Sequence, residues 1–161
     1  MKSRESVQEL CGLISKHIPI LQELFDYAAT LKSEAIDIQA KTRTQALAVA
    51  GLVENYYTCL ETIFLRISQF FENNLPPEKW HTRLLEKMTL DIPGVRPAVI
   101  TDTTCQLLLE LLRFRHFKRY YFQLNYDWDR LEYVLKKLFE AHVLVIRDLE
   151  EFRQVLNKVD S

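Results

Sequence analysis

Glycine and proline are scarce in this chain, which has only 3 glycines and 5 prolines among its 161 residues. Because these residues form most tight turns, their scarcity excludes a sandwich or barrel with many turns, and also a glycine-rich phosphate-binding loop. Hydrophobic residues make up 48% of the chain, which is enough for one hydrophobic core. We therefore expect a single all-α domain over residues 1–161, an antiparallel bundle of four to five helices.

Cysteine is scarce as well, and the three cysteines, Cys11, Cys59 and Cys105, lie far apart without a CxxC pair. This pattern indicates neither a zinc site nor a disulfide framework, and free thiols are typical of a reducing cytoplasm. The histidines have no partner at metal-ligand spacing, so we expect no metal and no cofactor. No window reaches the ~18 apolar residues that span a bilayer, and no leader pattern opens the chain. These absences predict a cytoplasmic protein without membrane contact.

An excess of either charge is also missing, since 21 lysines and arginines face 22 aspartates and glutamates, for a formal net charge of −1. This balance excludes a protein that coats itself with nucleic acid over its whole surface. Local clusters of one sign remain compatible with the balance, so a small basic site is not excluded.

Apolar residues recur every three or four positions along most of the chain, which is the spacing of amphipathic helices. This pattern predicts five helices, over residues 3–40, 42–73, 78–90, 101–122 and 128–158. Pro19 lies inside the first of them and is expected to kink or break it near His17 and Ile18. The loop over residues 91–100 carries apolar side chains, so we expect it to pack against the helices.

The end of the fourth predicted helix, here called the motif helix, is the most unusual part of the sequence. Residues 113–122 combine five basic or imidazole groups with five aromatic residues, and no acidic residue lies between Glu110 and Asp127. Four of these groups are permanent cations: Arg113, Arg115, Lys118 and Arg119. In a chain of net charge −1, this segment forms a concentrated positive patch.

On a helix, side chains four residues apart lie above one another, so the side chains of this patch form columns along the helix axis. Arg115 and Arg119 are four residues apart and share a face with Phe122. His116 and Tyr120 form a second column, about 100° away around the helix axis. An arginine guanidinium can donate two hydrogen bonds to one phosphate group. A histidine can transfer protons near neutral pH, and aromatic rings can stack on exposed bases. This combination is typical of a metal-free ribonuclease.

A purely structural interpretation of the same segment stays open. Cations near the C-terminus of a helix are favoured by the helix dipole, and aromatic residues between them are typical of core rings that alternate with solvated charges. Glu54 and Asn55 present a similar choice in the second predicted helix. Either they face the motif helix and orient Arg115, or they belong to a solvated face.

Three separated segments agree with one known family in order and spacing. They are residues 114–119 with the following 124–131, the linker over residues 88–100, and residues 54–64 of the second predicted helix. Together they resemble the HepT-like toxins of the HEPN superfamily. The resemblance extends from about residue 40 to about residue 150.

The resemblance implies a HEPN-like helical bundle that forms a homodimer, with the motif helices of two protomers facing each other. It also implies a metal-independent endoribonuclease that acts on RNA, with tRNA as a candidate substrate, and serves as the toxin of a toxin–antitoxin pair. The implied partner is a small MNT-type nucleotidyltransferase antitoxin, which attaches AMP to a tyrosine near the active site of its toxin.

This sequence departs from the family motif, which is an arginine, a polar residue, three further residues, a histidine, one residue and a tyrosine. Arg115 and His116 match its first two positions. Tyr120 stands at the histidine position and Phe122 at the tyrosine position, so the usual proton-transfer group and the usual AMP acceptor are missing. Either His116 takes over the acid–base role, or the protein has lost cleavage and binds RNA or a partner as a dimeric subunit.

On the first hypothesis, the catalytic residues are Arg115, His116 and Tyr120. The other cations of the motif helix are predicted to bind RNA phosphates: Arg113, Lys118 and Arg119. Tyr120 or Tyr121 is the candidate for AMP attachment, and the sequence does not distinguish between them.

Overall fold

The structure, a computed structural model, describes residues 4–37, 41–72 and 80–159. This part of the chain folds into five helices and contains no strand longer than an isolated bridge. The helices are α1 (Arg4–Asp37), α2 (Arg43–Phe71), α3 (Trp80–Lys87), α4 (Asp102–Tyr120) and α5 (Trp128–Val159). The predicted all-α fold is confirmed, and α4 is the motif helix.

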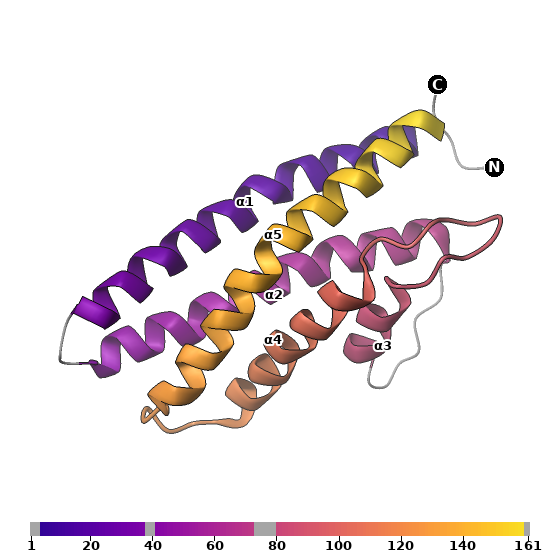
Figure 1. Ribbon diagram of the computed structural model, residues 1–161. Coiled ribbons are helices and arrows are strands. Elements are labelled where there is room, and N and C mark those ends of the chain that lie inside the picture. The colour runs from indigo at the N-terminus through magenta and orange to yellow at the C-terminus, as the bar shows by residue number, and fades with distance from the viewer. Residues whose placement is uncertain (1–3, 38–40, 73–79, 160–161) are drawn as a thin grey trace.

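Four of the helices are long and form the bundle, in which α1 runs antiparallel to α2 and α4 runs antiparallel to α5 (Figure 1). The short helix α3 lies at one side and packs against both α2 and α4. α2 contacts each of the other four described helices. The topology therefore brings α3, which is remote from the motif in the sequence, next to the motif helix.

The core is built largely around α2, because apolar residues repeat along its full length at helical spacing. Its largest fully buried side chains are Tyr56, Tyr57, Leu60, Ile63, Phe64 and Ile67. Each apolar side chain of this kind contributes about 1.5–3 kcal/mol through its removal from water. α2 is therefore the central element of the bundle.

Pro19 lies inside α1, which continues unbroken from Arg4 to Asp37. The break expected near His17 is therefore wrong. Pro19 itself is exposed, whereas Ile14 and Leu21 on either side of it are fully buried. Burial of these flanking side chains holds the helix together across the one ladder hydrogen bond that a proline removes.

The motif helix begins at a defined cap and ends two residues earlier than predicted. Thr101 is the N-cap, and its hydroxyl accepts a hydrogen bond from the backbone N–H of Thr104 at 3.2 Å. Tyr121 is the extended C-cap residue, because its ring packs against Phe117 and Tyr126 and turns the chain toward α5. Phe122 consequently lies beyond the helix and is not part of its Arg115–Arg119 face.

The short helix α3 ends at Lys87, three residues before the predicted end, and the predicted start at residue 78 lies outside the described residues. The end is set by the linker, whose Val99 and Ile100 N–H groups donate to the carbonyl of Met88 at 2.8 and 3.1 Å. Both linker residues are buried. The predicted packing of this loop against the helices is confirmed.

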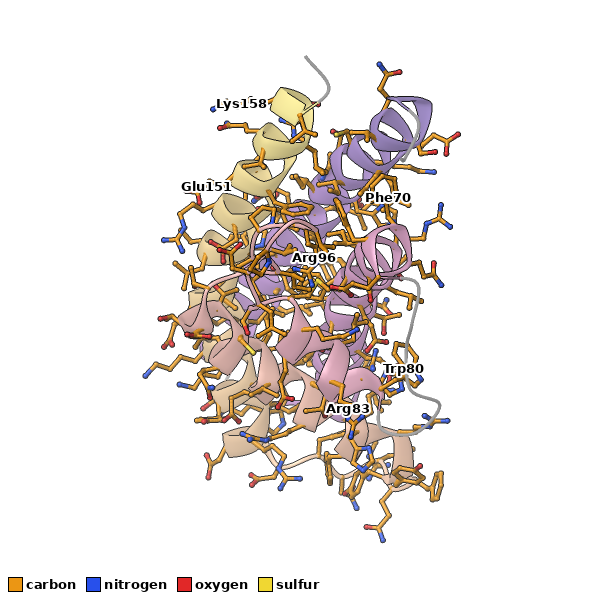
Figure 2. The ribbon with its side chains drawn as sticks, turned by 90° about the vertical axis from the view of Figure 1, so that its right-hand side faces the viewer. Phe70, Trp80, Arg83, Arg96, Glu151 and Lys158 are labelled. Carbon is orange, nitrogen blue, oxygen red and sulfur yellow. The ribbon has the colours of Figure 1, made fainter. Side chains whose placement is uncertain are left out.

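Arg96 ties the linker to the body of the protein, and Figure 2 shows it inside the molecule among the side chains of neighbouring helices. Its side chain is fully buried and forms an ion pair with Glu72, the C-cap residue of α2. It also donates hydrogen bonds to three backbone carbonyls, those of Lys87, Leu90 and Pro97. Gly94, at φ +74°, makes the turn that returns the chain to Arg96.

No helix in the described part of the chain combines the length and the hydrophobicity that a membrane-spanning segment requires. Cys105 is a buried thiol, and Cys59 is half-buried. Burial raises the pKa of the Cys59 thiol to about 11, so this thiol stays protonated at neutral pH.

Candidate functional site

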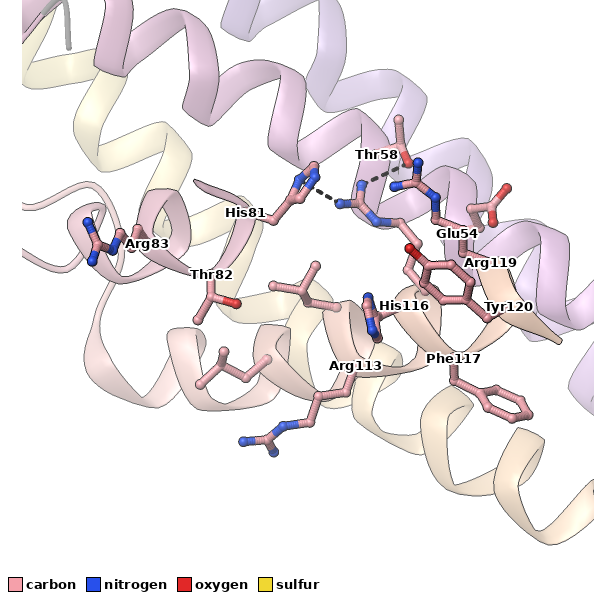
Figure 3. Close-up of a pocket in the computed structure, with 13 residues that line it drawn as sticks. Glu54, Thr58, His81, Thr82, Arg83, Arg113, His116, Phe117, Arg119 and Tyr120 are labelled. Atoms are coloured by element: carbon pink, nitrogen blue, oxygen red, sulfur yellow. Dashed lines mark hydrogen bonds between the residues drawn. The ribbon is translucent and has the colours of Figure 1, made fainter. Parts of the chain in front are cut away.

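A cleft of about 1130 Å³ opens between α2, α3 and α4 (Figure 3). Most of the residues predicted from the motif line it together: Arg113, Arg115, His116, Arg119 and Tyr120. α2 contributes Glu54 and Thr58, and α3 contributes His81, Thr82 and Arg83. The motif helix thus forms one wall of the cleft, while the residues from α3 were missed by sequence reasoning.

Arg115 lies at the inner side of the cleft, with only 15% of its side chain exposed. Its guanidinium forms a bidentate ion pair with Glu61, with N–O distances of 3.0 and 2.9 Å. It also donates to the Thr58 hydroxyl at 3.2 Å and lies 4.8 Å from the centre of the Tyr57 ring. These contacts hold Arg115 in one orientation, and Glu61 neutralises its charge.

Tyr57, beneath this guanidinium, stays a neutral phenol at physiological pH. Burial raises its pKa far above the ordinary value, the Glu61 carboxylate raises it further, and the charge of Arg115 lowers it by less. The aromatic face therefore stays available for the cation–π contact with Arg115.

The residue that orients Arg115 is Glu61. The sequence had offered Glu54 and Asn55 for this role. Glu54 instead forms an ion pair with Lys118 of the motif helix at 3.3 Å, and Asn55 is exposed. A signal for Glu61 was present, because it follows Glu54 by seven residues and therefore lies on the same face of α2. Its 7% exposure shows that this face is covered by α3 and α4.

His81 joins this group from α3. Its Nδ1 lies 2.7 Å from Oε2 of Glu61 and 3.1 Å from a terminal nitrogen of Arg115. Its ring packs against that of Trp80, with the ring centres 3.9 Å apart. The three charged or titratable groups Glu61, His81 and Arg115 therefore meet at one point, although each comes from a different helix.

His116 and Tyr120 form the second column that the sequence predicts, and their rings meet edge to face at 5.3 Å. Both residues are exposed, Tyr120 to 62%. Arg119 is also exposed and makes no ion pair with any described residue, while its guanidinium lies 5.9 Å from the Tyr120 ring. Arg119 is therefore the cation of the motif helix that is most available to an anionic ligand.

The remaining predicted residues are engaged by partners in the described part of the chain. Arg113 forms an exposed ion pair with Glu110 at 3.0 Å, and Lys118 is engaged by Glu54. The Tyr121 hydroxyl donates to the backbone carbonyl of Asn125 at 2.6 Å, and Tyr121 is not among the lining residues. Tyr120 is thus the accessible member of the tyrosine pair.

The side chains that line the cleft are mainly cationic, imidazole and apolar groups. Among the described residues, no group of three or more His, Cys, Asp or Glu side chains could hold a metal ion. The cleft is instead lined by four arginines, two histidines and one tyrosine: Arg83, Arg113, Arg115, Arg119, His81, His116 and Tyr120. Such groups bind a phosphate and move protons to or from its ester oxygens.

Comparison with protein families matches residues 48–156 to the family described as HepT-like protein. This match includes α3, the linker, the motif helix and most of α2 and α5. Comparison with curated proteins and with solved structures found no match. Because the match covers more than half of the chain and the fold is the helical bundle that the resemblance implied, the chain belongs to the HepT-like family of the HEPN superfamily.

Proposed function

We propose that this protein is the toxin of a toxin–antitoxin pair and cleaves RNA in the cleft between α2, α3 and α4 without a metal ion. The observation that carries the proposal is Arg119, which is exposed, pairs with no acidic side chain of the described residues, and lies beside His116 and Tyr120 in one open cleft. RNA presents a phosphodiester next to a 2′-hydroxyl. Cleavage needs charge stabilisation and proton transfer at that point.

Each predicted residue has a defined place in this function. Arg119 binds the scissile phosphate, and Arg115 adds positive potential at the inner wall, where Glu61 holds it. His116 and Tyr120 stand next to the reacting oxygens. The more peripheral cations, Arg113 and Lys118, bind neighbouring phosphates of the RNA.

The family resemblance supports two partners for this toxin. One is a second copy of the chain, so that the motif helices of two protomers face each other. The other is an MNT-type nucleotidyltransferase antitoxin that attaches AMP. Of the two candidate tyrosines, Tyr120 suits this modification better, because the Tyr121 hydroxyl is engaged by the Asn125 carbonyl.

The proposal is tested by incubating the purified protein with total tRNA and a labelled single-stranded RNA in EDTA. We expect cleavage by the wild type and a loss of about 100-fold or more in Arg119→Ala, which removes the phosphate-binding cation. Lys136→Ala is the matched control, since Lys136 is an exposed cation of α5 outside the cleft. RNA bound by the wild type but left intact contradicts the enzymatic function.

A binding role without cleavage is the second candidate. It is favoured by Tyr120 and Phe122, which replace the histidine and tyrosine of the family motif, and by the ion pair that neutralises Arg115. On this alternative, the wild type binds RNA or its partner in EDTA and never cleaves, and expression of the protein causes no growth arrest. Growth arrest that Arg119→Ala relieves contradicts it.

A further inference from the structure

The cleft contains an imidazole that the motif does not include, His81 of α3. Its Nδ1 lies 2.7 Å from Oε2 of Glu61, and a terminal nitrogen of Arg115 lies 2.9 Å from the same oxygen. Because both nitrogens donate to one acceptor, they approach each other to 3.1 Å. A carboxylate paired with a guanidinium is ionised and cannot donate, so the ring proton of His81 is on Nδ1.

With the proton on Nδ1, the other ring nitrogen of His81 is a free acceptor. Within the described part of the chain Nε2 has no hydrogen-bond partner, and 36% of the side chain is exposed. Figure 3 shows His81 and His116 in the same cleft, His81 on α3 and His116 on α4. A buried carboxylate that fixes the tautomer of an imidazole and leaves its other nitrogen for substrate is the arrangement of a general base.

His116 differs from His81 in this respect. Its ring meets the edge of the Tyr120 ring, and among the described residues no carboxylate holds either of its nitrogens. His116 is exposed, while the side chain of Glu61, which orients His81, is 9% exposed. The two imidazoles therefore differ. Glu61 holds His81 in a fixed orientation, whereas His116 is exposed on the wall of the cleft.

We infer that His81, positioned by Glu61, is the general base of this site, an assignment that rests on the proposed ribonuclease function. Nε2 of His81 takes the proton of a ribose 2′-hydroxyl while the 2′-oxygen forms a bond to the adjacent phosphorus. The bond from phosphorus to the 5′-oxygen breaks, and this oxygen leaves with a proton from His116. The products are a 2′,3′-cyclic phosphate and a 5′-hydroxyl end, and exchange with water restores both histidines.

This assignment gives the cleft the proton-transfer group that Tyr120 does not supply at the histidine position of the motif. The base comes from a different helix but reaches the same Arg115. Glu61 has two tasks in it, because one carboxylate holds both the guanidinium and the imidazole. Glu61 is thus a positioning residue, and His81 is the residue that contacts the substrate.

The first test replaces His81 by asparagine, whose side-chain amide still donates to Glu61 but lacks an equivalent of Nε2. His17→Asn is the matched control, because Nδ1 of His17 also contacts a protein oxygen, the Leu13 carbonyl at 2.8 Å, far from the cleft. We expect single-turnover cleavage in EDTA to fall about 100-fold or more in His81→Asn and to stay unchanged in His17→Asn. RNA affinity stays at the wild-type value in both.

The second test uses Glu61→Gln and compares kcat with KM. Among the described residues, the charged groups that contact the His81 ring are Glu61 from α2 and Arg115 from α4. A glutamine amide both donates and accepts, so it no longer fixes the proton of His81 on Nδ1, and we expect kcat to fall while KM stays close to the wild-type value. A change in KM with kcat unchanged contradicts the assignment.

The outcomes separate this inference from the proposed function. A wild type that binds RNA without cleaving it overturns both. A wild type that cleaves, together with His81→Asn that cleaves at the rate of His17→Asn, overturns the role of His81 alone. If His81→Asn unfolds at a lower temperature than the wild type, His81→Ala is assayed with free imidazole, which restores cleavage only where a missing imidazole limits the rate.

Discussion

His142 is a buried histidine whose two nitrogens are both satisfied, unlike those of the histidines in the cleft. It is 3% exposed, with Nδ1 at 2.8 Å from the Tyr56 hydroxyl and Nε2 at 2.9 Å from Oε1 of Gln22. Its ring stacks on Phe25 at 4.2 Å. In the neutral ring, Nε2–H donates to Gln22 and Nδ1 accepts from Tyr56, so a proton on Nδ1 would break the hydrogen bond that Tyr56 donates.

This arrangement makes stability depend on pH. Burial lowers the pKa of His142 below its ordinary 6.5 and outweighs the nearby Asp26 carboxylate, which raises it. Between the two pKa values the unfolded chain binds a proton that the folded protein does not. The free energy of unfolding therefore falls as pH drops through 6.5, and the loss is complete below the folded-state pKa.

Urea denaturation between pH 7.5 and 5.5 measures this effect. We expect the free energy of unfolding to fall with pH by up to about 1.4 kcal/mol per pH unit for one proton in the wild type. We expect His142→Gln to reduce this slope, because it removes the group that binds the proton. Equal slopes in the wild type and His142→Gln contradict the prediction.

At the scale of elements, one buried arginine joins the linker to two helix ends. Arg96 pairs with Glu72 at the end of α2 and binds the carbonyl of Lys87 at the end of α3. Burial alone raises the pKa of Glu72, but the Ser68 hydrogen bond and then the Arg96 charge outweigh it and lower the pKa below 4.5. The position of α3, and with it the position of His81, depends on this contact.

We expect Arg96→Ala to lower the free energy of unfolding by about 3–5 kcal/mol, because the Glu72 carboxylate and the linker carbonyls lose their shared donor. Arg113→Ala removes an exposed ion pair with Glu110 and is expected to cost at most about 1 kcal/mol. Chemical denaturation compares the two variants. A cost for Arg96→Ala as small as that for Arg113→Ala contradicts the role of Arg96 as the tie between the linker and the helix ends.

On the scale of the whole molecule, apolar side chains are exposed where α4 passes into α5. Phe122 is 86% exposed, Tyr120 62% and Leu124 50%. These residues lie at the end of the motif helix, where the family resemblance implies contact with a second protomer. Contiguous exposed apolar side chains are typical of interaction surfaces.

We therefore expect the proposed homodimer to depend on Phe122. We expect Phe122→Asp to convert a dimer into a monomer in size-exclusion chromatography with light scattering, because a charge at the interface centre costs several kcal/mol. Val143→Asp is the matched control, since Val143 is 67% exposed on α5. If the wild type is monomeric, or if Phe122→Asp stays dimeric, this surface is not the dimer interface.

Much of the fold was predictable because it depends on local spacing. Scarce glycine and proline and the repeat of apolar residues predict the helices. The column of His116 and Tyr120 follows from four-residue spacing alone, and the structure confirms it. The local rules were wrong at two places. At Pro19 the helix continues, because Ile14 and Leu21 on either side are buried. At the end of α4 the helix stops early, where the Tyr121 ring packs against Phe117.

By itself, the sequence determined the all-α class, the positions of the helices and the positive end of the motif helix, because each is a property of residues within a few turns of one another. Only the tertiary structure decided that Arg115 is held by Glu61, 54 residues away, and is joined by His81, 34 residues away. These pairings arise from the packing of α2 and α3 against α4, which brings together groups that no local spacing relates.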